Sequence, residues 1–94
     1  MAKRDTGYTI LRADGRVERL TRETPFTLEE IQAIVGGDIE IPYRSHNGFL
    51  FVCNERGNLK ELPINYLAST YAAERGFDFL IVGDVLICPD WMIE

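Results

Sequence analysis

The chain has 94 residues, of which 46% are hydrophobic and 11% aromatic, and its formal net charge is −5. This length suits one domain with a thin core, so we expect a single domain over residues 1–94. The acidic balance argues against a general nucleic-acid binder, because affinity for a phosphate backbone comes from clustered cations. No apolar run is long enough to span a membrane, and no signal-type segment follows the charged N-terminus, so we expect a cytoplasmic protein.

The first predicted element is a β-hairpin. Two runs rich in β-forming residues, Thr6 to Leu11 and Val17 to Thr21, lie on either side of Ala13-Asp14-Gly15. An Asp-Gly pair between two such runs favours a tight hairpin turn. Because apolar and polar residues alternate imperfectly along both runs, we expect this hairpin near an edge of the sheet.

A helix is predicted to begin after Thr27. Thr27 can serve as the N-cap, and Glu30 three residues later completes a capping box. Phe26 before the cap can pack on Ile31 as a hydrophobic staple. Gly36-Gly37 ends the helix, since positive φ angles are needed there. The apolar residues at helical spacing are Leu28, Ile31, Ile34 and Val35.

A second hairpin and a second helix follow. The runs Ile39 to Tyr43 and Phe49 to Asn54 are joined by Ser45-His46-Asn47-Gly48, whose Asn-Gly pair favours a tight turn. The second helix is predicted to start near Pro63 and to run to about Arg75. Its expected buried stripe consists of Ile64, Leu67, Ala68, Tyr71 and Ala72. Its expected polar stripe consists of Tyr66, Ser69 and Thr70.

The last apolar region allows two interpretations. The runs 79–82 and 85–88 flank Gly83-Asp84, which is either the two-residue turn of a third hairpin or a bulge in one long strand. Both interpretations make this region central and buried on both faces. Trp91 and Met92 follow in a tail that either favours self-association or closes the bottom of the core.

The predicted order of elements is β-β-α-β-β-α-β, which indicates an α+β fold. A β-grasp-like domain, in which a mixed sheet wraps one amphipathic helix, has this order. The alternative is a generic sheet packed on two helices.

No catalytic centre is predicted, and we expect a non-enzymatic protein without a cofactor. The motifs of acyl transfer, zinc hydrolysis and nucleoside-triphosphate chemistry are missing. His46 is alone in a predicted loop, and Asp84 is better explained as a turn residue. Cys53 and Cys88 lack metal-site spacing and are expected to be two buried thiols, so no metal ligands are assigned.

Two clusters have the composition of a binding surface. The first contains Tyr43, Arg44 and His46, because arginine and aromatic residues are typical of binding hot spots. The second contains Asn65 and Tyr66 at the start of the second helix, where free N–H groups could receive an anionic group. The alternative is that the Asn65 side chain serves the backbone.

The chain also resembles a known group of proteins in a series of short motifs. These are residues 31–37, Ile39-Glu40, residues 54–60, Leu62-Pro63-Ile64-Asn65 and residues 81–85. In this order they are similar to an uncharacterised family of small proteins from phages, plasmids and bacterial genomes. The resemblance implies a mobile-element origin and accessory or counter-defence roles, but it brings no established activity and no catalytic residues.

Two functions of different classes follow. The first is a binding or accessory protein that docks on a protein partner through a sheet edge or through Tyr43–Asn47. The second is an oligomer that sequesters a small anionic, nucleotide-like ligand between protomers, with Arg44, Asn65 and Tyr66 as contacts. Both are compatible with a homo-oligomer.

Overall fold

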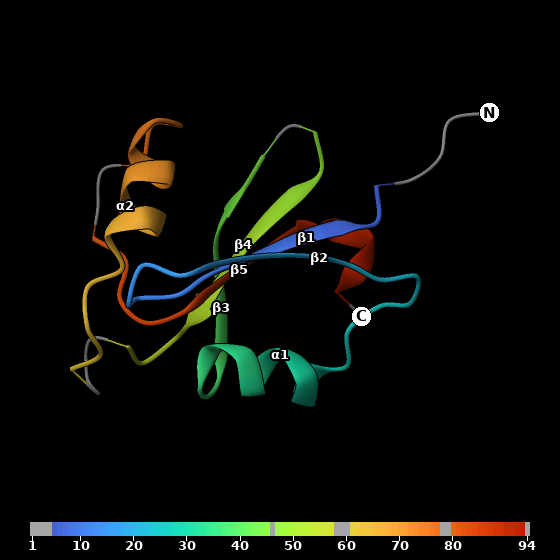
Figure 1. Ribbon diagram of the computed structural model, residues 1–94, viewed down its shortest axis with the longest axis horizontal. Helices are drawn as coiled ribbons and strands as arrows, with labels where there is room; N and C mark the ends of the chain where they lie inside the picture. Colours follow the sequence, from blue (N-terminus) through green and yellow to red (C-terminus); the bar gives the residue numbers. More distant parts are fainter. Residues whose placement is uncertain (1–4, 46, 58–60, 78–79, 94) are drawn as a thin grey trace.

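The computed structural model of the chain describes residues 5–45, 47–57, 61–77 and 80–93, which form a five-stranded sheet with two helices (Figure 1). The elements in chain order are β1 (Gly7–Leu11), β2 (Val17–Thr21), α1 (Leu28–Val35), β3 (Ile39–Arg44), β4 (Phe49–Asn54), α2 (Tyr66–Ala73), β5 (Val85–Pro89) and the single turn η1 (Asp90–Met92). The strand order across the sheet is β2-β1-β5-β4-β3. The α+β class and the predicted order of elements are therefore confirmed.

The sheet is antiparallel at each of its four strand pairs, so the predicted mixed sheet is wrong. β5 lies in the centre between β1 and β4, and the end of β1 is paired with the start of β5, Leu11 with Val85. The segment after α2 thus brings the chain back to the end of the sheet where β1 finishes. β5 must then run in the opposite direction to β1.

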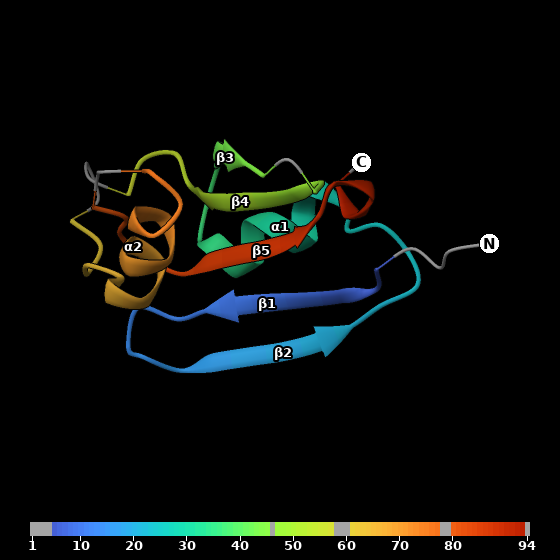
Figure 2. The ribbon, with the colours of Figure 1, turned by 90° about the horizontal axis from the view of Figure 1, so that it is seen from above.

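Two apolar clusters lie on opposite faces of the sheet. Ile31 of α1 packs with one set of strand residues, and Ala68 and Ala72 of α2 pack with the other. Figure 2 shows α1 beside the central strands, whereas α2 stands at one end of the sheet. Much of the second face is therefore left without a helix over it.

α1 forms as its sequence predicts. The Thr27 hydroxyl accepts a hydrogen bond from the Glu30 backbone N–H (3.2 Å), and Glu30 accepts one in return from the Thr27 N–H (2.9 Å). Gly36 closes the helix with φ 85°. Leu28 belongs to the predicted apolar stripe, but its exposed fraction is 55%, whereas Ile31 and Val35 of the same stripe are buried.

The segment before β5 is neither a hairpin nor part of a long strand. Its backbone pairs with the approach to α2: the Asn65 N–H donates to the Ile81 carbonyl (2.8 Å), and the Gly83 N–H donates to the Pro63 carbonyl (2.8 Å). Leu80 is exposed rather than buried. Phe79, which begins the predicted strand, lies outside the described residues. These contacts also explain why α2 starts at Tyr66 and not near Pro63.

α2 is turned relative to its predicted faces. Ser69 was expected on the polar stripe, but it is buried, and its hydroxyl accepts a hydrogen bond from the Ile81 N–H (2.8 Å). Leu67 was expected in the core and is exposed. The bond to the segment before β5 decides which face is buried.

Within the described ranges, no helix is long and apolar enough to cross a membrane.

The tail closes the core on the α1 side. Met92 is fully buried in the α1-side cluster, and Ile93 forms a bridge with Phe26. This confirms the interpretation of the tail as a segment that closes the bottom of the core.

Cys88 belongs to the α1-side cluster, whereas Cys53 belongs to the α2-side cluster. The two thiols are buried on opposite faces of the sheet and cannot form a disulfide.

Candidate functional site

The predicted binding residues are spread over two places. Tyr43 and Arg44 end β3, where the Tyr43 ring packs edge-on against Phe77 with the ring centroids 4.6 Å apart, and Arg44 is exposed. His46 lies outside the described residues. Tyr66 begins α2 and is 70% exposed.

The Tyr43 and Tyr66 clusters do not meet. Phe77 follows the C-terminal end of α2, whereas Tyr66 is its first residue. A helix of this length separates the two ends by about 12 Å. The structure therefore offers no shared site for Arg44 and Tyr66.

Asn65 serves the backbone rather than an external ligand. Its side chain is fully buried, and its amide nitrogen donates to the carbonyls of Leu11 and Gly83, each at 2.8 Å. Its amide oxygen caps α2 by accepting from the Ala68 N–H at 3.0 Å. The side chain thus ties together β1, the segment before β5 and α2.

Asp84 has a comparable structural role. Its carboxylate accepts from the Arg12 guanidinium (2.8 Å) and from the Ala13 N–H (2.9 Å), and Arg12 also pairs with Glu18. The two carboxylates raise the Arg12 pKa through these hydrogen bonds. The network fastens the β1–β2 hairpin to the start of β5, and no substrate-facing group is left over at Asp84.

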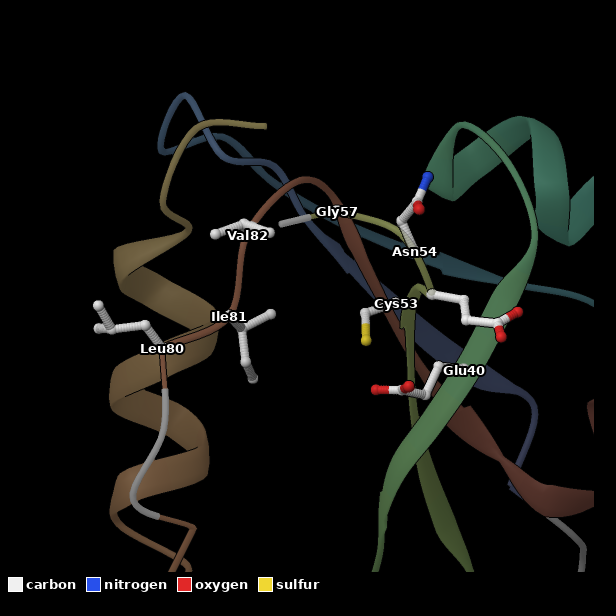
Figure 3. Close-up of a pocket in the computed structure, with 8 residues that line it drawn as sticks. Glu40, Cys53, Asn54, Gly57, Leu80, Ile81 and Val82 are labelled. Carbon is white, nitrogen blue, oxygen red and sulfur yellow. The ribbon is translucent and has the colours of Figure 1, made fainter. Parts of the chain in front are cut away.

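A pocket of about 170 Å³ opens at the end of the sheet near α2 (Figure 3). Glu40 and Cys53 lie on its β3–β4 side, and Leu80, Ile81 and Val82 lie on the other side. The pocket combines two acidic residues, Glu40 and Glu55, with the Cys53 thiol, and these are groups that a catalytic or metal site could use.

The chemistry of this pocket is nevertheless inert. Burial, with a smaller contribution from the nearby Glu40 charge, raises the pKa of Cys53 to about 11, so the thiol is protonated at neutral pH and is a poor nucleophile. The Asn54 amide is engaged with the Val35 carbonyl (3.1 Å) and the Arg56 N–H (2.8 Å). No cluster of three metal-ligating side chains occurs among the residues that the structure describes. We assign no catalytic role to this pocket.

The two edges of the sheet differ in their capacity to accept another strand. β3 carries Pro42, which has no N–H, and its pairing with β4 is interrupted by a register shift between Glu40 and Tyr43. Proline and bulges are the features that protect an edge strand from further pairing. β3 is therefore a closed edge.

β2 has neither of these features and forms an open edge. It pairs residue by residue with β1, from Thr21 opposite Gly7 to Val17 opposite Leu11. The Arg22 N–H donates to the Thr6 carbonyl (3.0 Å), and hydrogen-bonded pairs alternate along an antiparallel ladder. The N–H and C=O groups of Val17, Arg19 and Thr21 therefore point away from β1. Figure 2 shows β2 as the outer strand beyond β1.

A groove on the α2 side of the sheet adjoins this edge. Its volume is about 210 Å³, and it is lined by Gly7, Tyr8, Thr9, Leu11, Arg19, Phe49, Tyr71 and Ile87. A shallower hollow of about 380 Å³ extends it over Leu20 and Thr21 of β2. Arg19 forms no ion pair with any residue in the described part of the chain. The groove thus combines aromatic walls with one free cation.

Neither the groove nor the open edge at β2 is predicted from the sequence. Arg19, Phe49 and Tyr71 belong to β2, β4 and α2, so only the tertiary fold brings them together. The imperfect alternation of apolar and polar residues in the first hairpin predicts a position near a sheet edge. The structure confirms it, because β2 is an outer strand. The signal in the sequence that separates the closed edge from the open one is Pro42 in β3.

Comparison with known proteins gives a family but no activity. A family model described as a domain of unknown function, DUF3846, matches residues 8–91. Searches of the curated proteins and of the solved structures found no match. The phage or plasmid origin implied by the resemblance stays a prediction. Because the match extends over most of the sequence, the chain belongs to the DUF3846 family of domains of unknown function.

Proposed function

We propose that this chain is a non-enzymatic protein-binding module that accepts an extended strand of its partner along β2. The observation that carries the proposal is the contrast between the two sheet edges. β3 is closed by Pro42 and a register shift, whereas β2 is regular and four of its five side chains are exposed. Proteins usually protect an exposed edge, and β2, although it carries charged side chains, has neither a proline nor a bulge and so remains able to pair with another strand.

Strand addition explains how so small a surface could select a partner. The outward N–H and C=O groups of Val17, Arg19 and Thr21 would supply main-chain hydrogen bonds, which give affinity without regard to sequence. Exposed Leu20 and Val17, at 45% and 41%, lie on opposite faces of the strand, since their β1 partners Tyr8 and Leu11 belong to opposite faces. These two side chains would supply specificity.

Arg19→Pro tests this proposal by closing the edge. The Arg19 N–H points away from β1, so proline removes a donor for the partner without breaking a β1–β2 hydrogen bond. Peptides selected on the purified protein from a displayed random library should bind Arg19→Pro at least about tenfold more weakly, through the lost hydrogen bond and the bulk of the ring. Fluorescence anisotropy on labelled peptides measures the affinities.

Arg19→Ala is the matched control, because it keeps the backbone N–H and removes only the side chain. Most selected peptides should retain their affinity for Arg19→Ala within about threefold, as expected for one exposed charge. Equal binding of the peptides to wild type and Arg19→Pro, with both proteins folded by circular dichroism, would refute strand addition at β2.

A second function is favoured by the groove beside β2. Arg19 without a carboxylate partner, in a groove that Phe49 also lines, suits a small anion that carries a flat apolar part. The Tyr71 ring at the groove is already covered by the Arg75 guanidinium, 3.5 Å from the ring centroid. The proposed ligand is of the same nucleotide-like class as the one predicted from the sequence, but its site is the groove beside β2 and not Arg44, Asn65 and Tyr66.

Isothermal titration with mono-, di- and cyclic nucleotides and with pyrophosphate tests this second function. We expect saturable binding of a nucleotide that falls about tenfold or more in Arg19→Ala, because a charge-assisted hydrogen bond is lost. Lys3, Arg44 and the other cations remain in that variant. Heat signals that are flat, or equal in wild type and Arg19→Ala, would exclude the groove as an anion site.

The cytoplasmic location and the accessory role on a mobile element stay predictions.

A further inference from the structure

We infer that the strand accepted at β2 is the β2 strand of a second copy, in a two-fold antiparallel pairing centred on Leu20. The inference rests on the proposed function and names the occupant of that edge. It is carried by the order of charges along the strand, Arg16-Val17-Glu18-Arg19-Leu20-Thr21-Arg22. Because each register of a self-pairing places a different residue opposite its own copy, the charges discriminate between the registers.

Three other registers are unfavourable, and one centred on Val17 would run into the turn at residues 13–15. A pairing centred on Glu18 puts two carboxylates directly opposite each other, and one centred on Arg19 does the same with two guanidinium groups. Like charges directly opposite on neighbouring strands are destabilising. A pairing centred on Thr21 has little strand to use, since the chain bends away from the sheet at residues 23–24.

The register centred on Leu20 satisfies the backbone and the side chains together. Arg19 of one copy and Thr21 of the other, whose N–H and C=O groups both point outward, become hydrogen-bonded partners. The exposed Leu20 side chain packs on its own copy. Each Glu18 then lies opposite Arg22 of the second copy, on the same face as Leu20, and these charges are opposite in sign. Within one chain Glu18 is already paired with Arg12 and Arg22 with Glu30, so the new contact extends two existing ion pairs. Neither helix stands over β2 at this edge (Figure 2).

The pairing would also complete the groove beside β2. Arg19 of the second copy comes to lie next to Thr21, which lines the outer part of the groove together with Gly7. The two Arg19 residues then sit diagonally across the new strand pair, with their Cα atoms about 7–8 Å apart. Each groove gains a cation from the other protomer, which is the arrangement that an anionic ligand held between protomers requires.

The contact is small and the dimer is expected to be weak. Two five-residue strands bury less than the roughly 1,200 Å² of a standard stable interface. Dissociation in the micromolar range or weaker follows, so the dimer must be trapped or studied at several protein concentrations.

Leu20→Cys tests the register directly. In the Leu20-centred pairing the two residues at position 20 form a non-hydrogen-bonded pair with Cα atoms about 4.5 Å apart, inside the disulfide range. Val17→Cys is the matched control, because Val17 is equally exposed but would lie about 20 Å from its copy. The native Cys53 and Cys88 are buried and do not interfere.

Under mild oxidation, Leu20→Cys should form a disulfide-linked dimer at least about tenfold faster than Val17→Cys, with non-reducing electrophoresis as the readout. Equal cross-linking rates, or a wild type that stays monomeric in sedimentation at all concentrations, would overturn the self-pairing. The proposal that β2 accepts a partner strand would still hold after that outcome if the selected peptides bind Arg19→Pro more weakly than Arg19→Ala. A different outcome is also possible: peptides bind Arg19→Pro and Arg19→Ala equally well, while Leu20→Cys still forms the disulfide-linked dimer rapidly. β2 would then serve self-association and not the binding of other proteins.

Discussion

Asn65→Ala is expected to lower the free energy of unfolding by about 3–5 kcal/mol, because it removes three hydrogen bonds in the interior of the protein. The lost hydrogen bonds join the Leu11 and Gly83 carbonyls and the Ala68 N–H to one fully buried amide. Asn65 is also the N-cap of α2, so the helix end loses its cap. Urea unfolding followed by circular dichroism measures the effect.

Tyr66→Ala is the control for Asn65→Ala, since it changes the neighbouring residue at the same helix end. The Tyr66 side chain is 70% exposed, and its removal should alter the free energy of unfolding by no more than about 0.5 kcal/mol. A loss below about 1 kcal/mol in Asn65→Ala would contradict the structural role of this side chain and would reopen Asn65 as a ligand contact.

Gly57→Ala is expected to lower the free energy of unfolding by about 2 kcal/mol, because there is no room for the added methyl group. A Cβ at position 57 would stand 2.6 Å from the Val82 Cγ2 atom. Figure 3 shows Gly57 and Val82 facing each other across the end of the pocket. Gly57 has no positive φ, so the effect isolates crowding from backbone strain.

Two variants make the Gly57 result specific. Gly7→Ala has a nearest neighbour at 3.4 Å and no positive φ, so it should change the free energy of unfolding by less than about 0.5 kcal/mol. Adding Val82→Ala to Gly57→Ala removes the clashing methyl group, and the double variant should lose less stability than the sum of the single ones. Strict additivity in this cycle would show that Val82 is not what Gly57 must avoid.

The local elements could be predicted because their signals lie within a few residues. Thr27 and Glu30 sit three positions apart in the capping box and bond as expected, and Gly36 takes the positive φ that a helix end needs. The two hairpins form where short turn sequences separate β-rich runs. Each of these features is stabilised mainly by neighbours in sequence.

The segment around Gly83 could not be predicted, because distant residues decide its structure. Its apolar run resembles a strand, but its backbone bonds to Pro63 and Asn65, near the start of α2. The same contacts turn Ser69 inward and Leu67 outward. Tertiary hydrogen bonds here override the local pattern, and the direction of β5 follows from the path that they impose.

The candidate site was out of reach of the sequence for a related reason. Tyr43, Arg44 and Tyr66 had the composition of hot spots, but composition does not state which residues share a surface. Arg19 is one of several arginines in the N-terminal hairpin, and only the strand order places it between an open edge and a groove. Openness of an edge is a property of the whole sheet.

Amide hydrogen exchange of β2, resolved by NMR, tests the central claim most directly. In dilute protein the Glu18, Leu20 and Arg22 amides should be protected by β1, whereas the Val17, Arg19 and Thr21 amides should exchange fast. On raising the protein concentration or adding a selected peptide, those three fast amides should slow down together. Slow exchange elsewhere, with Val17, Arg19 and Thr21 unchanged, would contradict the account of β2 as the strand-accepting edge.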